Sequence, residues 1–364
     1  MKQITYLWLL ILCSISMSSK AQVVLKGIVY NAETKMPIES ANVYISNSTK
    51  GTITNNKGYF NLTTNAVGRS ELVVSFVGYE TQTISITQDA KYLEVLLNPK
   101  YEDLQAVVVT QYEKNGWKKW GKLFLKSFIG TTQFSKGCKL LNKEVIKFHY
   151  SKKRNILTVR ANGRLNIENK SLGYILKYDL VKFEIDFDNQ STLIQGYPWF
   201  EEMQSEKKSD QIKWLNNRDE AYYGSMMQFM RSIYFDKIER ERFEVRRIIT
   251  LPNNSHQLIN KLIPRDSLIF KVDSVSIGLN FKDYLQVTYT LKEPPSGYPI
   301  PNNGKMGYLT MPQTSQLTLN DNVIKIYSNG AYYDGTNLVS SGYWGWSEKM
   351  ANLLPLDFEP SNNP

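Results

Sequence analysis

Short apolar strands separated by turn signals fill the first hundred residues, and this alternation constrains the fold more than any other feature. Apolar side chains recur at every second position, for example at Ala41, Val43 and Ile45. Turn residues separate the runs, as in the Asn-Asn-Lys-Gly stretch at 55–58, where glycine can adopt a positive φ. Short strands at this spacing are typical of an all-β sandwich, which we expect over residues 22–100.

The amino-acid composition limits the chemistry open to the protein. The chain has 364 residues, of which 42% are hydrophobic and 21% charged, as in ordinary globular proteins with two domains. It has only two histidines, His149 and His256, and two cysteines, Cys13 and Cys138. This shortage argues against most metal sites and most histidine-dependent catalysis. We expect no bound metal and no cofactor.

The first 21 residues have the pattern of a secretory signal peptide. Lys2 supplies a positive start, an apolar run follows over 4–15, and Ser19 and Ala21 are small residues placed for cleavage before Gln22. The alternative is a membrane anchor, but the run is too short to cross a bilayer as a helix. We expect an exported protein, periplasmic or associated with the outer membrane. Export also argues against a nucleic-acid partner, despite an isoelectric point of about 9.2.

Several motifs of the first domain together resemble a known family. They are Gly27-Ile28-Val29, Pro37-Ile38-Glu39-Ser40-Ala41, Asn55-Asn56-Lys57-Gly58-Tyr59-Phe60 and Phe76-Val77-Gly78-Tyr79. This order of turns is similar to the carboxypeptidase-regulatory-like domain. The resemblance implies a seven-stranded transthyretin-like sandwich, which in Bacteroidota often begins TonB-dependent transporters and other envelope proteins. It implies no peptidase activity. The run Leu104–Val109 is similar to the strand that follows such domains, but the chain ends too early for a transporter barrel.

A basic stretch over 101–143 separates the two predicted domains. The spacing within it predicts an amphipathic helix over 117–129, with Trp117, Trp120, Phe124 and Phe128 on one face. Two interpretations remain open. The aromatic face packs into a protein core, or the helix contacts an anionic membrane surface or an acidic partner. The cations that would make that contact share the opposite face: Lys118, Lys119, Lys122 and Lys126.

Residues 144–364 predict an α+β domain of mostly antiparallel strands with one long helix. Apolar alternation marks the strands, and the period changes to a helical one over 210–235, with Asp210 as a candidate N-cap. Arg218 falls within the apolar arc of this helix beside Tyr222. An arginine there snorkels, pairs with a buried acid or faces a ligand. The predicted fold is therefore mainly β: a sandwich followed by an α+β domain.

Aromatic residues near the C-terminus provide a second candidate binding site. Tyr343, Trp344 and Trp346 lie close together in the sequence, and aromatic faces suit both sugar stacking and a packed core. Runs such as Asn217–Ser225 and Gly342–Trp346 resemble Bacteroidota envelope proteins with the same first domain. That resemblance implies an architecture and no particular chemistry.

These observations favour a non-enzymatic, exported cell-envelope protein. The sandwich would be an interaction module, and the second domain would bind an envelope partner or a glycan through Arg218, Tyr222 and the aromatic cluster. The alternative is a secreted, glycan-active hydrolase that uses carboxylates. Its candidate acids are the adjacent pairs Glu201-Glu202 and Asp219-Glu220, which would have to converge across a cleft.

Overall fold

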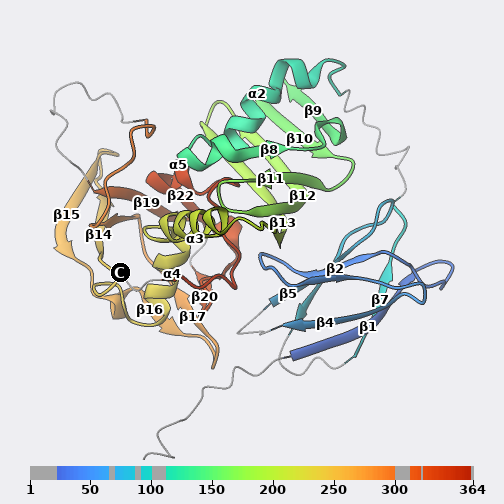
Figure 1. Cartoon of the computed structure of the whole chain (residues 1–364). Helices are drawn as coiled ribbons and strands as arrows, with labels where there is room; N and C mark the ends of the chain where they lie inside the picture. Colours follow the sequence, from blue (N-terminus) through green and yellow to red (C-terminus); the bar gives the residue numbers. More distant parts are fainter. Residues whose placement is uncertain are drawn as a thin grey trace, which may run out of the picture.

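The computed structural model shows a mainly β protein (Figure 1). The predicted signal peptide and the run Leu104–Val109 lie outside the part of the chain that the structure describes. The described residues are 23–64, 70–86, 92–100, 112–299, 312–320 and 323–361.

The first domain is the predicted sandwich, with seven strands among its described residues. One sheet has the order β4-β1-β7, in which β1 and β7 are parallel, and the other has the antiparallel order β3-β2-β5-β6. Gly58 has φ +70° in the predicted turn, where a Cβ would lie 2.6 Å from the Val29 oxygen. The strands are β1 (Val23–Asn31), β2 (Asn42–Ile45), β3 (Gly51–Ile53), β4 (Tyr59–Thr64), β5 (Ser70–Ser75), β6 (Gln82–Ile86) and β7 (Tyr92–Leu97).

A six-stranded antiparallel sheet begins the second domain. Its order is β8-β11-β12-β10-β9, and β13 pairs with β12 along almost its whole length. Alternate residues of these strands are buried, which is why the sequence showed a period of two. The strands are β8 (Cys138–Leu140), β9 (Ile146–Ser151), β10 (Ile156–Ala161), β11 (Leu165–Asn169), β12 (Tyr174–Asp186) and β13 (Ser191–Glu202).

The helix expected over 117–129 is present as α2 (Gly116–Phe128) and packs on this sheet. Phe124 and Phe128 are fully buried, and Phe124 contacts Phe148 of β9 and Phe183 of β12. The short helix η1 (Gln133–Gly137) follows. Because the aromatic side of α2 is inside the protein, the first of the two interpretations holds for that face.

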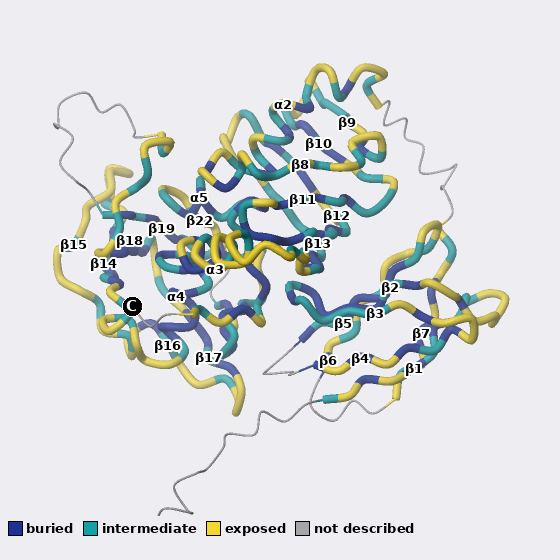
Figure 2. Tube along the Cα trace, viewed as in Figure 1, coloured by how far each residue is buried: buried dark blue, intermediate teal, exposed yellow. Residues whose placement is uncertain are grey.

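Two smaller sheets complete the domain, and α4 packs between them. The orders are β15-β14-β18-β19-β22 and β16-β17-β20-β21. Phe229 and Ile233 of α4 belong to the core that both sheets share, as the buried inner segments in Figure 2 show. The elements are β14 (Phe243–Thr250), β15 (His256–Leu262), β16 (Ile269–Lys271), β17 (Ser276–Leu279), β18 (Tyr284–Tyr289), β19 (Gln313–Leu319), β20 (Ile324–Tyr327), β21 (Tyr332–Tyr333), β22 (Leu338–Gly342) and α5 (Tyr343–Ser347).

The single long helix expected over 210–235 is wrong in detail, because the structure has two helices there. These are α3 (Lys208–Tyr222) and α4 (Met226–Tyr234). Gly224, with φ +89°, lies between them, and Ser225 caps α4 by accepting a hydrogen bond from the Gln228 N–H over 3.2 Å. Asp210 is not the N-cap of α3: that position is Lys207, and Asp210 lies in the first turn.

Candidate ligand-binding site

A loop of the sandwich, residues 46–50, joins it to the second domain. This loop lies between β13 and the C-terminal segment of the second domain. The Asn47 N–H donates to the Pro198 oxygen over 2.7 Å, and the Phe200 N–H donates to the Ser48 oxygen over 3.0 Å. On the other side, the Leu356 N–H donates to the Asn47 oxygen over 2.6 Å. The loop therefore adds main-chain hydrogen bonds both to β13 and to the C-terminal segment.

A polar network lies beside this loop. The guanidinium of Arg164 binds both carboxylate oxygens of Asp179, at 2.9 and 2.7 Å, and also the Ser75 hydroxyl. The Tyr44 hydroxyl donates to Asp179 over 2.6 Å, and its ring stacks on Trp199 with centroids 5.4 Å apart. Burial, together with the negative charge of Asp179, raises the pKa of Tyr44 well above its ordinary value. Residues of both domains satisfy this network, so it fixes their relative position.

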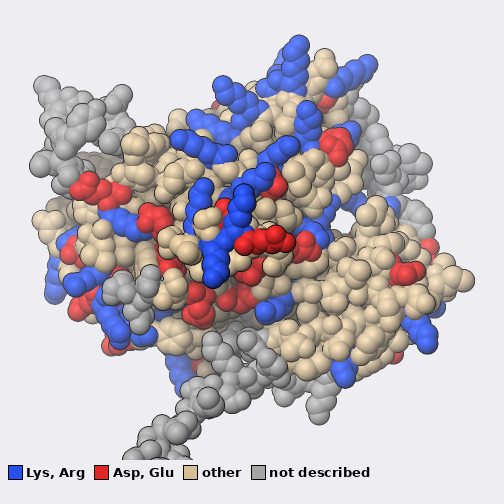
Figure 3. Space-filling model, in the orientation of Figure 1, with Lys and Arg blue, Asp and Glu red and all other residues tan. Residues whose placement is uncertain are grey.

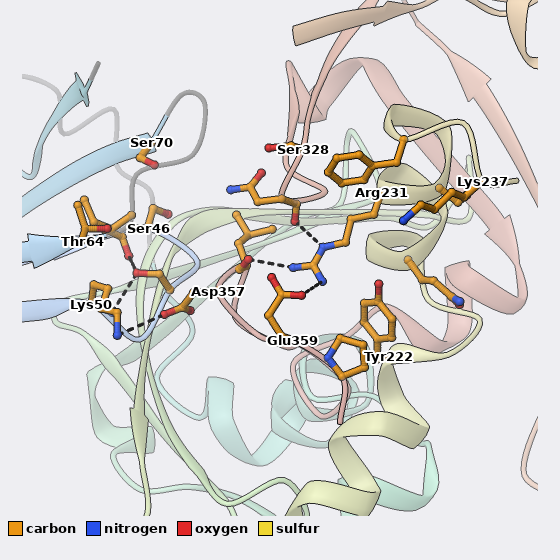
Figure 4. Close-up of a pocket in the computed structure, with 18 of the residues that line it drawn as sticks. Ser46, Lys50, Thr64, Ser70, Tyr222, Arg231, Lys237, Ser328, Asp357 and Glu359 are labelled. Atoms are coloured by element: carbon orange, nitrogen blue, oxygen red, sulfur yellow. Dashed lines mark hydrogen bonds and ion pairs between the residues drawn. The ribbon is translucent and has the colours of Figure 1, made fainter. Parts of the chain in front are cut away.

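A cavity of about 440 Å³ opens next to the joint (Figure 4). Its walls come from three parts of the chain: the sandwich, the α3–α4 region with the residues after it, and the C-terminal third. Most of its polar groups are hydroxyls and amides, and four aromatic rings lie among them. The lining residues used below are Lys50, Tyr222, Tyr223, Gln228, Arg231, Phe235, Lys237, Glu241, Asn329, Tyr333, Asp357 and Glu359.

Arg231 holds two of these walls together. Its Nε donates to the Asn329 oxygen over 3.0 Å, and its Nη2 donates to the oxygens of Leu356 and Phe358 over 3.0 and 2.9 Å. Its Nη1 lies 3.9 Å from the Glu359 carboxylate. A buried arginine with these contacts is a structural clamp that shapes the cavity.

Other side chains remain open to a ligand at the edge of the cavity. Phe235 has 50% of its surface exposed, and the Lys237 ammonium lies 5.4 Å from the centre of its ring. Glu241 accepts a hydrogen bond from the Gln228 amide over 2.8 Å. With three cations and three carboxylates in the lining, the site has no formal net charge. It offers hydrogen bonds and ring faces to a polar, uncharged ligand.

Comparison with known proteins identifies the first domain. Residues 25–109 match the family described as CarboxypepD_reg-like domain. This stretch of the chain is a CarboxypepD_reg-like domain. The same region is 38% identical over 91 residues to the TonB-dependent receptor SusC of Bacteroides thetaiotaomicron, which covers 25% of this chain and 8% of the receptor. The shared domain is consistent with a Bacteroidota envelope protein, although the chain matches only this small part of the receptor's length.

Solved structures add no argument about function. A DUF3823 family protein from Bacteroides ovatus is 12% identical, with a TM-score of 0.18, over 51% of this chain and 83% of its own. The C-terminal domain of the shaft pilin SpaA from Lactobacillus rhamnosus is 19% identical, with a TM-score of 0.19, over 22% of this chain and 99% of its own. These scores are too low to extend the identification beyond the CarboxypepD_reg-like domain.

The structure places Arg218 and Tyr222 on α3 but in different surroundings. Arg218 is buried, and its Nε donates to the Leu172 oxygen over 2.7 Å. Its other nitrogens bind the Gly173 oxygen and the Glu202 carboxylate at 3.1 and 3.0 Å. Each of its three nitrogens thus has a protein partner. Tyr222 lines the cavity, where burial raises its pKa.

The C-terminal aromatic residues separate into a core residue and a surface cluster. Trp344 is buried, and its Nε1 donates to the Gly224 oxygen over 2.8 Å. Tyr343 and Trp346 are half-buried and, with Tyr298, form a trio whose ring centres lie 5.4 to 5.7 Å apart. Trp344 belongs to the core between the two smaller sheets, and Tyr222 to the core of the six-stranded sheet. The predicted site residues are therefore not brought into one pocket.

The four lysines of α2 are all exposed, on the side away from the core. Lys119 lies 3.1 Å from the Glu113 carboxylate and 4.6 Å from the Trp120 ring centre. The structure describes no ion pair for the other three, which are Lys118, Lys122 and Lys126.

The carboxylates proposed for hydrolysis all have protein partners. Glu201 lies 2.5 Å from the Lys177 ammonium, and Glu220 lies 3.1 Å from Lys292. Glu202 binds Arg218, and Asp219 accepts hydrogen bonds from the Ser361 N–H and hydroxyl. The carboxylates in the cavity are different ones, namely Glu241, Asp357 and Glu359.

Sequence reasoning missed most of the cavity. Arg231 interrupts the apolar stripe of α4 just as Arg218 interrupts that of α3, so the same signal could have found it. Phe235 and Lys237 follow the end of α4, and they belong to no periodicity or motif that would have indicated a binding site. Among the described residues, no group of three or more His, Cys, Asp or Glu side chains could hold a metal ion, and no helix is long and apolar enough to cross a bilayer.

Proposed function

We propose that this protein is a non-enzymatic, exported cell-envelope protein that binds a glycan in the cavity between its two domains. The observation that carries the proposal is the composition of that cavity, which combines hydroxyl, amide and carboxylate groups with Tyr222, Tyr223, Tyr333 and Phe235. Sugars present hydroxyls at their edges and C–H groups on their faces. A site with hydrogen-bonding groups and aromatic faces complements both.

The balance of charge supports a neutral glycan over an anionic one. Arg231 is already engaged by three carbonyl oxygens, and Lys50 lies 3.9 Å from Asp357. Lys237 alone would be left to bind a ligand anion. The shared domain with a TonB-dependent receptor supports the envelope location.

The proposal is tested by titrating purified protein with a panel of neutral oligosaccharides in a calorimeter. Replacing Phe235 with Ala removes an exposed ring from the site, so we expect about tenfold weaker binding, since a ring contact contributes about 0.5–1.5 kcal/mol beyond area burial. The matched control is Phe270→Ala, because Phe270 is 46% exposed and lies outside the lining of the cavity. Binding of no oligosaccharide in the panel, or equal losses in the two variants, would contradict the proposal.

A carboxylate-dependent glycan hydrolase remains the second candidate, because Glu241, Asp357 and Glu359 line the same cavity. Asp357 accepts hydrogen bonds from the Thr49 N–H and hydroxyl, at 3.0 and 2.5 Å, which favours a structural role for it. Release of reducing ends from a bound oligosaccharide, abolished by Glu241→Gln, would favour the hydrolase.

A further inference from the structure

The positive charge of the chain is concentrated in one segment. Residues 112–170 contain fifteen Lys and Arg and only three acidic residues, a formal charge of +12, whereas the whole chain carries +10. The one cation of this set that is not exposed is Arg164, which binds Asp179. The exposed ones are Lys114, Lys118, Lys119, Lys122, Lys126, Lys136, Lys139, Lys143, Lys147, Lys152, Lys153, Arg154, Arg160 and Lys170.

These residues build one lobe of the molecule, which we call the basic lobe. It comprises α2, η1 and β8 to β11, and Figure 3 shows blue side chains gathered over it with few red ones between. Acids neutralise little of this charge: Glu113 pairs with Lys119, and Glu168 with Lys170. The lobe thus carries a largely uncompensated positive charge on two faces. The lysines of α2 point away from the sheet, whereas Lys147 and Arg160 alternate with the buried residues that face α2 and lie on the opposite side of the sheet.

The arrangement of the cations destabilises the helix and the strands that carry them. Lys118, Lys122 and Lys126 follow one another at intervals of four along α2, and Lys147 lies directly opposite Arg160 in the β9–β10 pairing. Like charges at both spacings destabilise the elements that carry them. An anionic partner that covers the exposed face of α2 would turn the repulsion among Lys118, Lys122 and Lys126 into attraction to the partner.

A hollow extends the basic lobe toward α3. It has a volume of about 420 Å³ and is lined by Lys136 of η1, Lys170 of the β11–β12 turn and Lys213 of α3. The side chains of Ser171 and Asn217 line it as well. Three ammonium groups from three elements around one hollow are suited to a phosphate group.

The side chains favour lipid headgroups over a protein partner. Twelve of the fourteen exposed cations are lysines, which are depleted in protein interfaces, whereas arginine and aromatic residues are enriched. Within residues 112–170 the only exposed large hydrophobic residues are Tyr112 and Leu141, at 39% and 49% exposure, so the surface has no apolar centre. The aromatic face of α2 is buried and cannot insert into a membrane. We infer that the basic lobe docks the protein electrostatically on a membrane surface rich in anionic phospholipid.

The test is co-sedimentation of the purified chain with vesicles. Vesicles of equal parts phosphatidylcholine and phosphatidylglycerol should bind it, and pure phosphatidylcholine should not. Replacing Lys118, Lys122 and Lys126 with Gln should weaken binding by about a hundredfold, since each lysine near the surface contributes about 1 kcal/mol. The matched control replaces three exposed lysines of the sandwich, Lys26, Lys35 and Lys57, with Gln.

Several outcomes would overturn the inference. They are no binding to the anionic vesicles, binding that persists when salt screens the charges, and equal losses in the two triple variants. Retention on a soluble sulfated polysaccharide without vesicle binding would also overturn it, in favour of a polyanionic glycan. Because the variants leave the interdomain cavity unchanged, oligosaccharide titration of the same proteins reports separately on the proposed function.

Discussion

Glu348 places a carboxylate against the first turn of α4, where the Met226 N–H donates to its Oε1 over 3.1 Å. Removal from water disfavours the charged form and outweighs this hydrogen bond, so the pKa of Glu348 is raised from 4.5 to about 6. The folded protein therefore holds this proton more tightly than the unfolded chain does. A neutral Glu348 stabilises the fold, and that contribution is present in full below the unfolded pKa.

This residue predicts a pH dependence of stability. As pH rises through the window from 4.5 to about 6, the contribution of Glu348 is lost, which lowers the free energy of unfolding by about 2 kcal/mol. Urea unfolding at a series of pH values should show a smaller decrease in Glu348→Gln than in the wild type. The exposed Glu239 supplies the control, Glu239→Gln, whose curve should follow the wild type. Identical curves for all three proteins would show that Glu348 does not carry the effect.

At the scale of elements, α2 divides its residues sharply between core and solvent. Phe124 has no exposed surface and contacts the rings of Trp117, Phe128, Phe148 and Phe183. The lysines on the other side reach only solvent and a few neighbouring groups. The helix is thus fixed by its apolar face, and its charged face can vary without affecting the fold.

Substitutions on the two faces should therefore differ in cost. Phe124→Ala should lower the free energy of unfolding by about 3–5 kcal/mol, because it leaves a cavity among aromatic rings. Lys122→Ala on the exposed face should change it by less than about 0.5 kcal/mol. Chemical denaturation monitored by tryptophan fluorescence measures both. A small loss in Phe124→Ala would mean that α2 is not docked as described.

Helix α2 also shows how much of the fold could be predicted from the sequence alone. The helical period placed Phe124 and Phe128 on one face of the helix, and the structure shows that this face is buried. The break between α3 and α4 is marked in the sequence by Gly224 and Ser225, a glycine that can end a helix and a serine that can cap the next one, but the apolar stripe that continues across them obscured this signal. At Gly224 a Cβ would lie 2.6 Å from the Gln313 oxygen and 2.9 Å from the Tyr289 ring, and both residues are distant in sequence.

The candidate site was hidden for the same reason. The sequence marks Arg218 as unusual, but its partners Leu172 and Gly173 lie about 46 residues away and bind through main-chain oxygens, which have no sequence signature. The cavity depends on the meeting of segments around Lys50, Phe235 and Asp357. The periodicity of apolar residues along the sequence does not show which distant segments of the chain are in contact.

At the scale of the whole molecule, the two domains share a buried interface. The Tyr44–Trp199 stack, the hydrogen bonds from the Tyr44 and Ser75 hydroxyls to Asp179, and main-chain hydrogen bonds of Asn47 and Ser48 all cross it. The ion pair with Arg164 holds Asp179 in place within the second domain, where Tyr44 and Ser75 of the sandwich bind it. Because these groups are largely removed from water, leaving Asp179 without its partners from the sandwich would cost about 1–3 kcal/mol. We therefore expect the CarboxypepD_reg-like domain and the second domain to unfold together.

Calorimetry can test this coupling. The wild type should show one heat-absorption peak, and the double variant Asp179→Asn, Trp199→Ala should show two, one for each domain. Trp120→Ala is the control, because Trp120 packs against Tyr150 and Phe187 within the second domain. Trp120→Ala should lower the unfolding temperature of the protein but keep a single heat-absorption peak. Two peaks in the wild type would show that the domains unfold independently.

The docking loop of the sandwich also bears on how the protein is assembled during synthesis. Thr49 binds Asp357, which follows it by 308 positions along the chain. A ribosome makes the first domain long before it makes the segment that fastens it. The contacts of the loop with Pro198 and Phe200 can form first, and the contacts with Leu356 and Asp357 complete the joint only after that later segment has emerged. A chain that stops between β13 and residue 356 would keep the contacts of the sandwich with β13 but lack those with Leu356 and Asp357.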